Sequence, residues 1–425
     1  MRNHVLLLGM LCLATPILSQ AATLSTMTPA QPLSDARIGA LPPAQQPPWR
    51  DYLARSRALM AADKAALQAE GTFDATARPH GGAPDGGMPL RRPAAWYGSP
   101  EALRVASNIL SFQTPAGGWG KNVDRSGPPR RPGEPWVPFE AGQRKASWSY
   151  VGTFDNGATT SELRFLARVQ AQLPGAQGES YRAAFAKGLR YILNAQYPNG
   201  GFPQVYPLQG GYHDAVTLND DAMVRVVTLL MEVGEGQGDF AFVPEALKEA
   251  ASGAVQRAVS LFLATQQRGA DGKLTGWGQQ YEALSLALAG ARNFEPAALA
   301  SPESAGVLQL LMRLPDPSPE VRGAVHAGVA WLRTAALRDL AWTSTPDAGR
   351  RLLPSPGAPL LWSRYYDART LAPIFGDRDR SIHDDVNELQ PERRNGYAWF
   401  GTAPAKAIER YALWLGQAKQ APNAP

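Results

Sequence analysis

A repeated unit of two helices constrains the fold of this 425-residue chain more than any other feature. Three segments, 102–113, 185–196 and 255–266, place apolar residues at the i, i+4, i+7 and i+8 spacing of one helix face, and each ends at a glutamine. A loop with glycine beside an aromatic residue follows each glutamine, in GGWGKN, NGGFPQ and LTGWGQQ. A second helical stretch comes next, in SELRFLARVQ, DDAMVRVVTLLMEV and YEALSLALAGAR. Each unit is therefore predicted to be a pair of helices joined by a glycine-aromatic loop.

A fourth, weaker copy starts at Val325 and closes with APAKAIERYALWLG. Helix pairs that recur at roughly 70–80 residues are long for an open solenoid and favour a ring of alternating inner and outer helices. We expect an all-α-dominated (α/α) toroid of about three to four helix pairs. Its loops should be long and irregular, with short strands such as 202–206. In such a ring the loops at one end line a cleft.

The regions outside the repeat have their own signals. Residues 1–21 are predicted to be a secretory signal peptide, because Arg2 and His4 precede a short apolar run with small residues at its exit. Residues 22–95 form a Pro/Gly-rich leader with a helix at 49–67, and we expect the leader up to that helix to be loosely ordered. The toroid occupies 96–418, and 419–425 are a tail. We therefore expect a secreted or periplasmic protein.

Cysteine usage and charge restrict the chemistry. Cys12 is the only cysteine and lies inside the predicted signal peptide, which excludes thiol nucleophiles, disulfides and thiolate-bound zinc from the mature chain. Five scattered histidines lack metal-ligand spacing, so any metal should be a hard cation held by oxygen. The net charge of +5 comes without a Lys/Arg run, so we expect no nucleic-acid partner and, after signal removal, no membrane partner. An anionic glycan suits the abundant arginines, and we expect a monomer.

Two acidic clusters stand where loops turn into helices: Asp155-Asn156 in TFDNGATTSELRF and Asn219-Asp220-Asp221 in VTLNDDAMVRVV. Repetition should place them at equivalent corners of two units, as a hard-cation site or as a carboxylate pair for acid–base work. Helix N-capping competes with this interpretation, since Asp and Asn are preferred caps. Capping explains one such residue per helix, but not the adjacent carboxylates of Asp220 and Asp221, which repel unless a cation or dipole offsets them.

Basic and aromatic residues form a second group of candidates. Arg292 ends the third predicted pair in LALAGARNFEP, where it could also stabilise a helix C-terminus. The segment WSRYYDARTLAPIFGDRD holds Arg364, Tyr365, Tyr366 and Arg378. Guanidinium groups pair with carboxylates and aromatic faces pack on sugar rings, so this mixture fits a cleft for sugar acids. Alternatively, the Asp and Arg residues of this segment could form ion pairs with one another, which would account for the same sequence pattern. Lys121, after Gly-Gly-Trp-Gly, is a further candidate for contact with an anion.

In their order, six motifs resemble the pectate lyases of polysaccharide lyase family 10: GGWGKN, TFDNGATTSELRFL, YPNGGFPQVYP, TLNDDAM, WGQQYEALSLALAGARNFEPAALASPES and WSRYYDARTLAPIFGDRD. The resemblance extends from about residue 96 to the C-terminus. It implies a secreted enzyme with an (α/α) toroid that cleaves polygalacturonate by calcium-assisted β-elimination. In that family an arginine removes the proton from C5 of the sugar acid.

Residue by residue, the resemblance implies Arg292 as the base. It implies Asp155, Asp220 and, less directly, Asp221 as calcium ligands. Arg364 and Arg378 would bind substrate carboxylates, with Tyr365 or Tyr366 nearby. Beside the resemblance, Lys121 and Asn156 are further candidates for substrate binding. Because arginine is ordinarily protonated, an arginine base also predicts an alkaline pH optimum.

Two other interpretations remain open from the sequence, and a third is excluded. A toroidal glycoside hydrolase could use Asp155 and Asp220 as its two carboxylates. A non-catalytic exported protein could bind acidic glycans without turnover. A zinc-dependent prenyl-transfer toroid lacks the cysteine ligand that it would need. Product chemistry separates the first two from a lyase, because only elimination produces an unsaturated, ultraviolet-absorbing sugar end.

Overall fold

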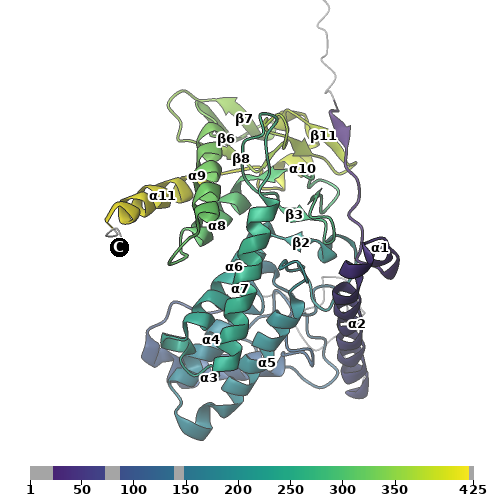
Figure 1. The fold of residues 1–425 in the computed structure, drawn as a ribbon, viewed down its shortest axis with the longest axis vertical. Helices are drawn as coiled ribbons and strands as arrows, with labels where there is room; N and C mark the ends of the chain where they lie inside the picture. Colours follow the sequence, from purple (N-terminus) through teal and green to yellow (C-terminus); the bar gives the residue numbers. More distant parts are fainter. Residues whose placement is uncertain (1–22, 72–86, 138–147, 421–425) are drawn as a thin grey trace, which may run out of the picture.

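The computed structural model describes residues 23–71, 87–137 and 148–420 (Figure 1). The predicted signal peptide, residues 72–86 of the Gly/Pro-rich connection and residues 421–425 of the tail lie outside this part of the chain. Among the described residues, no helix is both long enough and apolar enough to cross a membrane.

Helices of the predicted repeat run from α3 to α11. They are α3 (Pro100–Ser111), α4 (Thr160–Ala171), α5 (Glu179–Ala195), α6 (Ala222–Glu235), α7 (Glu245–Thr265), α8 (Ser301–Leu311), α9 (Pro319–Thr334) and α11 (Ala403–Gln420). Helices α4, α6 and α8 contact one another in turn and form an inner row, while α5, α7 and α9 do the same as an outer row. The inner helices bury most of their residues, whereas α5 and α7 bury mainly one face. This is the alternation predicted for an (α/α) toroid.

The glutamine that ends each repeat segment ties neighbouring units together. Its Nε2 donates one hydrogen bond to a carbonyl of the following loop and another to a carbonyl of the next outer helix. The donors and acceptors are Gln113 with Gly117 and Ala184, Gln196 with Gly200 and Ala254, and Gln266 with Thr275 and Ala324. Satisfying two buried carbonyls with one amide fixes the loop against the next unit, which accounts for the recurrence of glutamine at this place.

The third unit corrects the sequence prediction. Residues 281–292, predicted as a helix, instead lie in the hairpin of β3 (Gln280–Tyr281) and β4 (Leu288–Ala289) and in the loop that follows it. The carboxylate of Glu282 accepts hydrogen bonds from the backbone amides of Leu284 and Ser285, and the next residue, Leu286, has a φ of 58°. Such a turn ends any helical path, and a short apolar run fits either period. Helix α8, further along the chain, closes this unit instead.

Short antiparallel strands join the loops at one end of the helices and build the part of the molecule after α9. The remaining strands are β1 (Ser25–Thr26), β2 (Val216–Thr217), β5 (Leu299–Ala300), β6 (Leu340–Thr345), β7 (Gly349–Pro354), β8 (Trp362–Ser363), β9 (Tyr365–Tyr366), β10 (Phe375–Gly376), β11 (Ser381–His383) and β12 (Phe400–Gly401). They pair as β2-β3-β4, β5-β9, β8-β12, β6-β7 and β1-β11-β10. The first two sets connect loops of successive units, so side chains from different repeats meet there. The short helix α10 (Pro391–Asn395) lies in the same strand-rich part.

The leader is more ordered than its composition suggested. Residues 24–34, which we call the N-terminal strap, run from β1 to the short helix α1 (Asp35–Gly39), and Figure 1 shows them along one edge of the molecule in purple. At one end β1 pairs with β11, and at the other the amide of Leu33 donates to Asp214 at 3.0 Å. These bonds fix a segment that has little apolar content of its own. The helix predicted at 49–67 is present as α2 (Gln46–Ala69).

Candidate active site

The two acidic clusters form turns of the same shape at the starts of two inner helices. The turn Asp155–Gly157 precedes α4, and Asn219–Asp221 precedes α6. Their central residues have nearly identical backbone angles: φ 52° and ψ 29° for Asn156, φ 52° and ψ 33° for Asp220. The two turns contact each other. Asn and Asp tolerate this left-handed conformation better than other side chains, which partly explains why they occur here.

Helix capping does not explain the acidic clusters. The N-cap residue of α4 is Thr159 and that of α6 is Asp221, and neither side chain makes a capping hydrogen bond. Asp155 and Asp220 lie before these positions, in the turns, and both line one pocket. The competing structural interpretation is therefore not supported at either cluster.

That pocket, the candidate active site, has a volume of about 190 Å³. It is bounded by the two turns, by Lys121, Tyr150 and Tyr212, by Gln204, Gln279 and Gln280, and by Ala291, Arg292 and Glu295. Of the residues predicted from sequence, the structure brings together Lys121, Asp155, Asn156, Asp220 and Arg292. They come from three repeat units, so the pocket exists only because the units are joined at their loop ends.

Asp155 is the buried carboxylate of the site. Its side chain is 6% exposed, and its Oδ2 lies 2.6 Å from Nζ of Lys121. The same Nζ lies 3.4 Å from the ring centroid of Tyr150. The lysine therefore neutralises Asp155 and is itself held by the aromatic face. An amide hydrogen bond of 3.1 Å from Asn156 Nδ2 to Asn122 leaves the Oδ1 atom of Asn156 as the acceptor of this side chain.

Asp220 is the exposed carboxylate, with 47% of its side chain accessible. It accepts a hydrogen bond of 2.9 Å from Asn219 Nδ2 and lies 3.6 Å from Nη2 of Arg364. That guanidinium donates more closely to Asn219 Oδ1 at 2.9 Å and to buried Glu303 at 3.0 Å. Although burial opposes it, the charge of Glu303 raises the pKa of Arg364. Arg364 therefore supports the second turn from behind rather than lining the pocket.

Asp221 lies apart from its neighbour. A side chain placed on Gly306 of α8 would meet Oδ1 of Asp221 at 2.3 Å, so this carboxylate packs against the inner helix. Burial raises its pKa, and the nearby charge of Asp220 acts in the same direction. Asp221 does not line the pocket. The described residues hold no group of three or more His, Cys, Asp or Glu side chains placed to bind a metal ion, so the predicted three-carboxylate set is not assembled.

Arg292 projects from the loop after β4 and is paired with Glu295. Its Nε donates to Glu295 Oε2 at 2.9 Å and its Nη2 to Oε1 at 2.5 Å, while its own backbone amide donates to Oε2 at 3.1 Å. Tyr397 donates to the same carboxylate at 2.7 Å. Burial lowers the pKa of Arg292, but the hydrogen bonds and charge of Glu295 outweigh it and raise that pKa. The guanidinium is 48% exposed and reaches the pocket, whereas Glu295 is 2% exposed.

Further arginines gather behind Arg292 around the ring of Phe294. The guanidinium carbons of Arg292, Arg378 and Arg393 lie 4.8, 4.9 and 4.1 Å from its centroid. Arg378 is 48% exposed and pairs with Glu392 at 2.9 Å. Burial lowers the pKa of Arg393, and the charges of Arg378 and Arg292 add to that effect. Three guanidinium groups therefore gather on this side of the site, and of these only Arg292 lines the pocket.

The two predicted tyrosines are buried and lie outside the pocket. Tyr365 shares hydrogen bonds with Gln279 and, at 2.8 Å, with Tyr397, so it supports the base of the site. Tyr366 accepts from the amide of Ser363 at 2.9 Å and donates to the carbonyl of Ala335 at 2.7 Å. The second tyrosine therefore fastens a loop to α9. The structure does not bring Tyr366 to the candidate site.

Tyrosines that the sequence did not single out do line the pocket. The hydroxyls of Tyr150 and Tyr212 are 3.1 Å apart. Burial raises the pKa of both, so they stay neutral donors up to alkaline pH. Their neighbour His213 has its pKa lowered to about 4 by burial and by Lys121, so it is neutral at neutral pH. Glu295 was missed as well, although its position three residues after Arg292 in ARNFEP was the available signal.

The arrangement suits chemistry on an anionic sugar. Two carboxylates and two amides from facing turns can hold a hard cation or hydroxyl groups. An exposed guanidinium stands opposite them, backed by further positive charge. In such a pocket, positive groups can neutralise the carboxylate of a bound sugar from two sides. A further side chain can then reach the carbon next to that carboxylate. Fold and site together define an (α/α)-toroid enzyme for acidic polysaccharides.

Comparison with known proteins identifies the family. The pectic acid lyase family matches residues 113–408. A family 10 polysaccharide lyase from Cellvibrio cellulosa is 32% identical with a TM-score of 0.65, covering 78% of this chain and 97% of that one. A mutant of a family 10 lyase from the same organism, in complex with trigalacturonic acid, is 31% identical with a TM-score of 0.65, covering 79% of this chain and 99% of that one. Curated protein sequences give no match.

The chain belongs to the pectic acid lyase family. The resemblance seen in its six motifs is thereby confirmed, as are the (α/α) toroid and the assignment as a lyase. The alternatives of a glycoside hydrolase, a non-catalytic glycan-binding protein and a prenyl-transfer toroid are not retained.

Proposed function

We propose that this lyase cleaves polygalacturonate by calcium-dependent β-elimination, with Arg292 as the base. The observation that carries the proposal is the placement of Arg292 across one pocket from the paired turns of Asp155 and Asp220. A family 10 relative is known in complex with trigalacturonic acid, which supports a galacturonate polymer as the substrate here.

Asp155, Asn156 and Asp220 are the residues that would hold a calcium ion. These side chains offer hard oxygen donors, but calcium takes about six to eight of them. With no three-acid group among the described residues, a complete shell needs oxygens from the uronate and from water. When bound, calcium withdraws electron density from the uronate carboxylate and so makes its C5 hydrogen more acidic.

The protein groups divide the remaining work. Arg292 takes the C5 proton, the C4–O4 bond breaks, a C4–C5 double bond forms and the departing oxygen takes a proton from solvent. Glu295 and Tyr397 fix the direction of the guanidinium through the bonds described above. Arg378 is half-exposed and can leave Glu392 for a substrate carboxylate. Lys121 screens the charge of Asp155 when the calcium site is empty.

The ion pair between Glu295 and Arg292 makes the activity expected from this mechanism depend on pH. A base must lose its proton, yet the pairing with Glu295 raises the pKa of Arg292. The neighbouring positive charges of Arg378 and Arg393 act against that pairing and favour the neutral form of Arg292. Activity should therefore rise with pH through the alkaline range, and a maximum at acidic pH would contradict Arg292 as the base.

The decisive experiment follows the ultraviolet absorbance of polygalacturonate with the native protein and with Arg292→Ala and Arg292→Lys. We expect unsaturated product that disappears with chelator and returns with added calcium. Both variants should lose activity by a factor on the order of 10³ or more, while a pull-down on insoluble pectate still retains them. Product formation that is insensitive to chelator, or full activity in either variant, would contradict the proposal.

We also propose that the enzyme is exported and acts outside the cytoplasm. The basis is the N-terminal sequence, with its basic start, apolar run and small residues around 19–22. N-terminal sequencing of the protein recovered from the periplasm or medium should begin near residue 22 or 23. Recovery of the uncleaved chain from the cytoplasm alone would argue against export.

A further inference from the structure

The N-terminal strap passes directly beside the candidate active site. Met27–Ala30, at its middle, line a cavity of about 160 Å³ whose other wall includes Tyr212, Arg292 and Asn293. Tyr212 and Arg292 also line the candidate active site, so the two spaces adjoin. The family match begins at residue 113, and the strap therefore belongs to the part of this chain outside the matched region.

Arg380 is the charged residue that this cavity adds. It belongs to the turn between β10 and β11, is exposed, and lines the cavity with the strap. Its carbonyl accepts from the amide of Met27 at 2.9 Å, and its amide donates to the carbonyl of Asp377 at 3.0 Å. Within the described residues its guanidinium has no hydrogen bond or ion pair, whereas Arg292 and Arg378 nearby are both paired.

The backbone conformation of Arg380 is a second indication of a functional role. Its φ of 74° lies in the left-handed region, which non-glycine residues rarely adopt. Strained residues of this kind cluster at functional sites, where the surrounding structure holds them in place. The strap supplies part of that support through Met27. Among the described residues, Arg380 is thus an unpaired arginine whose backbone conformation favours glycine.

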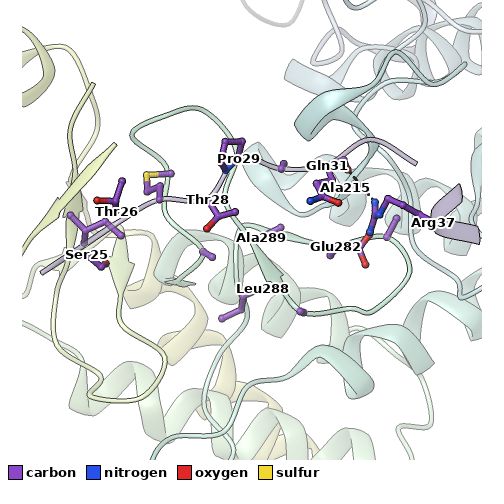
Figure 2. Close-up of a pocket in the computed structure, with 17 residues that line it drawn as sticks. Ser25, Thr26, Thr28, Pro29, Gln31, Arg37, Ala215, Glu282, Leu288 and Ala289 are labelled. Atoms are coloured by element: carbon purple, nitrogen blue, oxygen red, sulfur yellow. Dashed lines mark hydrogen bonds and ion pairs between the residues drawn. The ribbon is translucent and has the colours of Figure 1, made fainter. Parts of the chain in front are cut away.

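On its other side the strap borders a larger cavity of about 480 Å³, shown in Figure 2. There Leu288 and Ala289 of β4 lie opposite the strap residues Thr28 and Pro29. The charged side chains of this cavity, Arg37 and Glu282, are bonded to each other (Figure 2). Of the two spaces beside the strap, the one with Arg380 is the one with positive charge available for an anionic ligand.

We propose that the strap and Arg380 form an additional uronate-binding subsite next to the catalytic centre. Arg380 binds the carboxylate of a galacturonate residue that lies beyond the one attacked at Arg292, and Met27–Ala30 form the wall on which that sugar rests. The proposal deepens, and rests on, the proposed function. It assigns a role in substrate binding to the leader, whose sequence alone suggested only loose order.

The test compares oligogalacturonates of three to six residues on Arg380→Gln, Arg380→Gly and a matched control, Arg322→Gln, whose arginine is exposed on α9 and lines neither cavity. Loss of a charge-assisted contact should raise KM for the hexamer about tenfold in both Arg380 variants, and for the trimer much less. The control should match the native enzyme at every length. Arg380→Gly also relieves the backbone, so its deficit cannot come from misfolding. An equal change at all lengths, or no change, would overturn the subsite.

A second variant tests the strap itself. Thr28 lines both cavities, so Thr28→Trp adds a bulky ring to the strap beside Arg380. It should reduce cleavage of the hexamer more than that of the trimer, whereas equal reductions would contradict the wall. Should the native enzyme give no unsaturated product from any substrate, the proposed function fails by itself. Calorimetric binding of hexagalacturonate then decides the subsite: about tenfold weaker binding to Arg380→Gln supports it, and unchanged affinity overturns it.

Discussion

The two turns at the centre of the site share one backbone but carry exchanged chemistry. Asp155 and Asn156 occupy the positions that Asn219 and Asp220 occupy in the next unit, so the first two positions of each turn hold one carboxylate and one amide in opposite order. The carboxylate is therefore at the buried first position in one turn and at the exposed central position in the other. Repetition of the helix pair reproduced the turn, and the difference in residue order directs both carboxylates into one pocket.

The two carboxylates also differ in their partners. Asp155 is bonded to Lys121 at 2.6 Å, while Asp220 keeps nearly half of its side chain exposed and has its nearest cation, Arg364, at 3.6 Å. We infer that Asp220 is ready to bind a cation, and that Asp155 must first exchange its lysine. The comparison predicts unequal catalytic roles on equal backbones.

The largest effect should follow from removing the exposed carboxylate. Asp220→Asn removes the one carboxylate that this turn presents to the pocket, and asparagine keeps the left-handed backbone. We expect the rate on polygalacturonate to fall on the order of 10³-fold, as several kcal/mol of charge stabilisation are lost. Asp155→Asn should cost less, about 10²-fold, because Lys121 already offsets that carboxylate. Initial rates at saturating calcium measure both, and a reversed order would break the comparison.

The pH profile tests whether Arg292, across the pocket from these turns, is the group whose loss of a proton controls the rate. Glu295→Gln removes the charge that raises the pKa of Arg292, so the neutral arginine forms at lower pH. The rising limb of kcat/KM against pH should move to lower pH by about one unit. The maximum rate should fall about tenfold, because the second carboxylate oxygen that directs the guanidinium is lost. A limb that stays in place would show that Arg292 is not the titrating group.

How much of this site was visible in the sequence depends on how far apart its parts lie in the chain. The turns, Lys121 and Arg292 were found because each stands in a recurring or local motif. Tyr397 was not found, because it reaches Glu295 from 102 residues away through packing that no local pattern records. Tyr366 was predicted to contact substrate because it stands in the same motif as Arg364, but its side chain holds a loop in place instead. The hairpin at 281–292 was missed since its apolar run also fits a helix, and the strap because long-range pairing with β11 orders it.

A smaller effect should separate the two roles of Lys121. If this lysine occupies the place of a cation at Asp155, Lys121→Gln should lower the calcium concentration for half-maximal rate about fivefold, because a like charge is removed from the site. Calcium titrations of the initial rate measure this shift. Arg313→Gln, a surface arginine paired with Glu232 away from the pocket, is the control. A higher calcium requirement in Lys121→Gln would assign the lysine to the support of calcium binding instead.

The smallest expected effect concerns stability, and it tests the backbone half of the comparison. Asn156 and Asp220 share a φ of 52°, so alanine should be strained equally at both positions and glycine at neither. We expect the free energy of unfolding of each alanine variant to be about 1 kcal/mol lower than that of its glycine counterpart. Chemical denaturation of the four variants gives the two differences. Equal values beside unequal catalytic losses would show that the repeat duplicates the turn while its side chains divide the function. Clearly unequal values would mean that the two turns are supported differently.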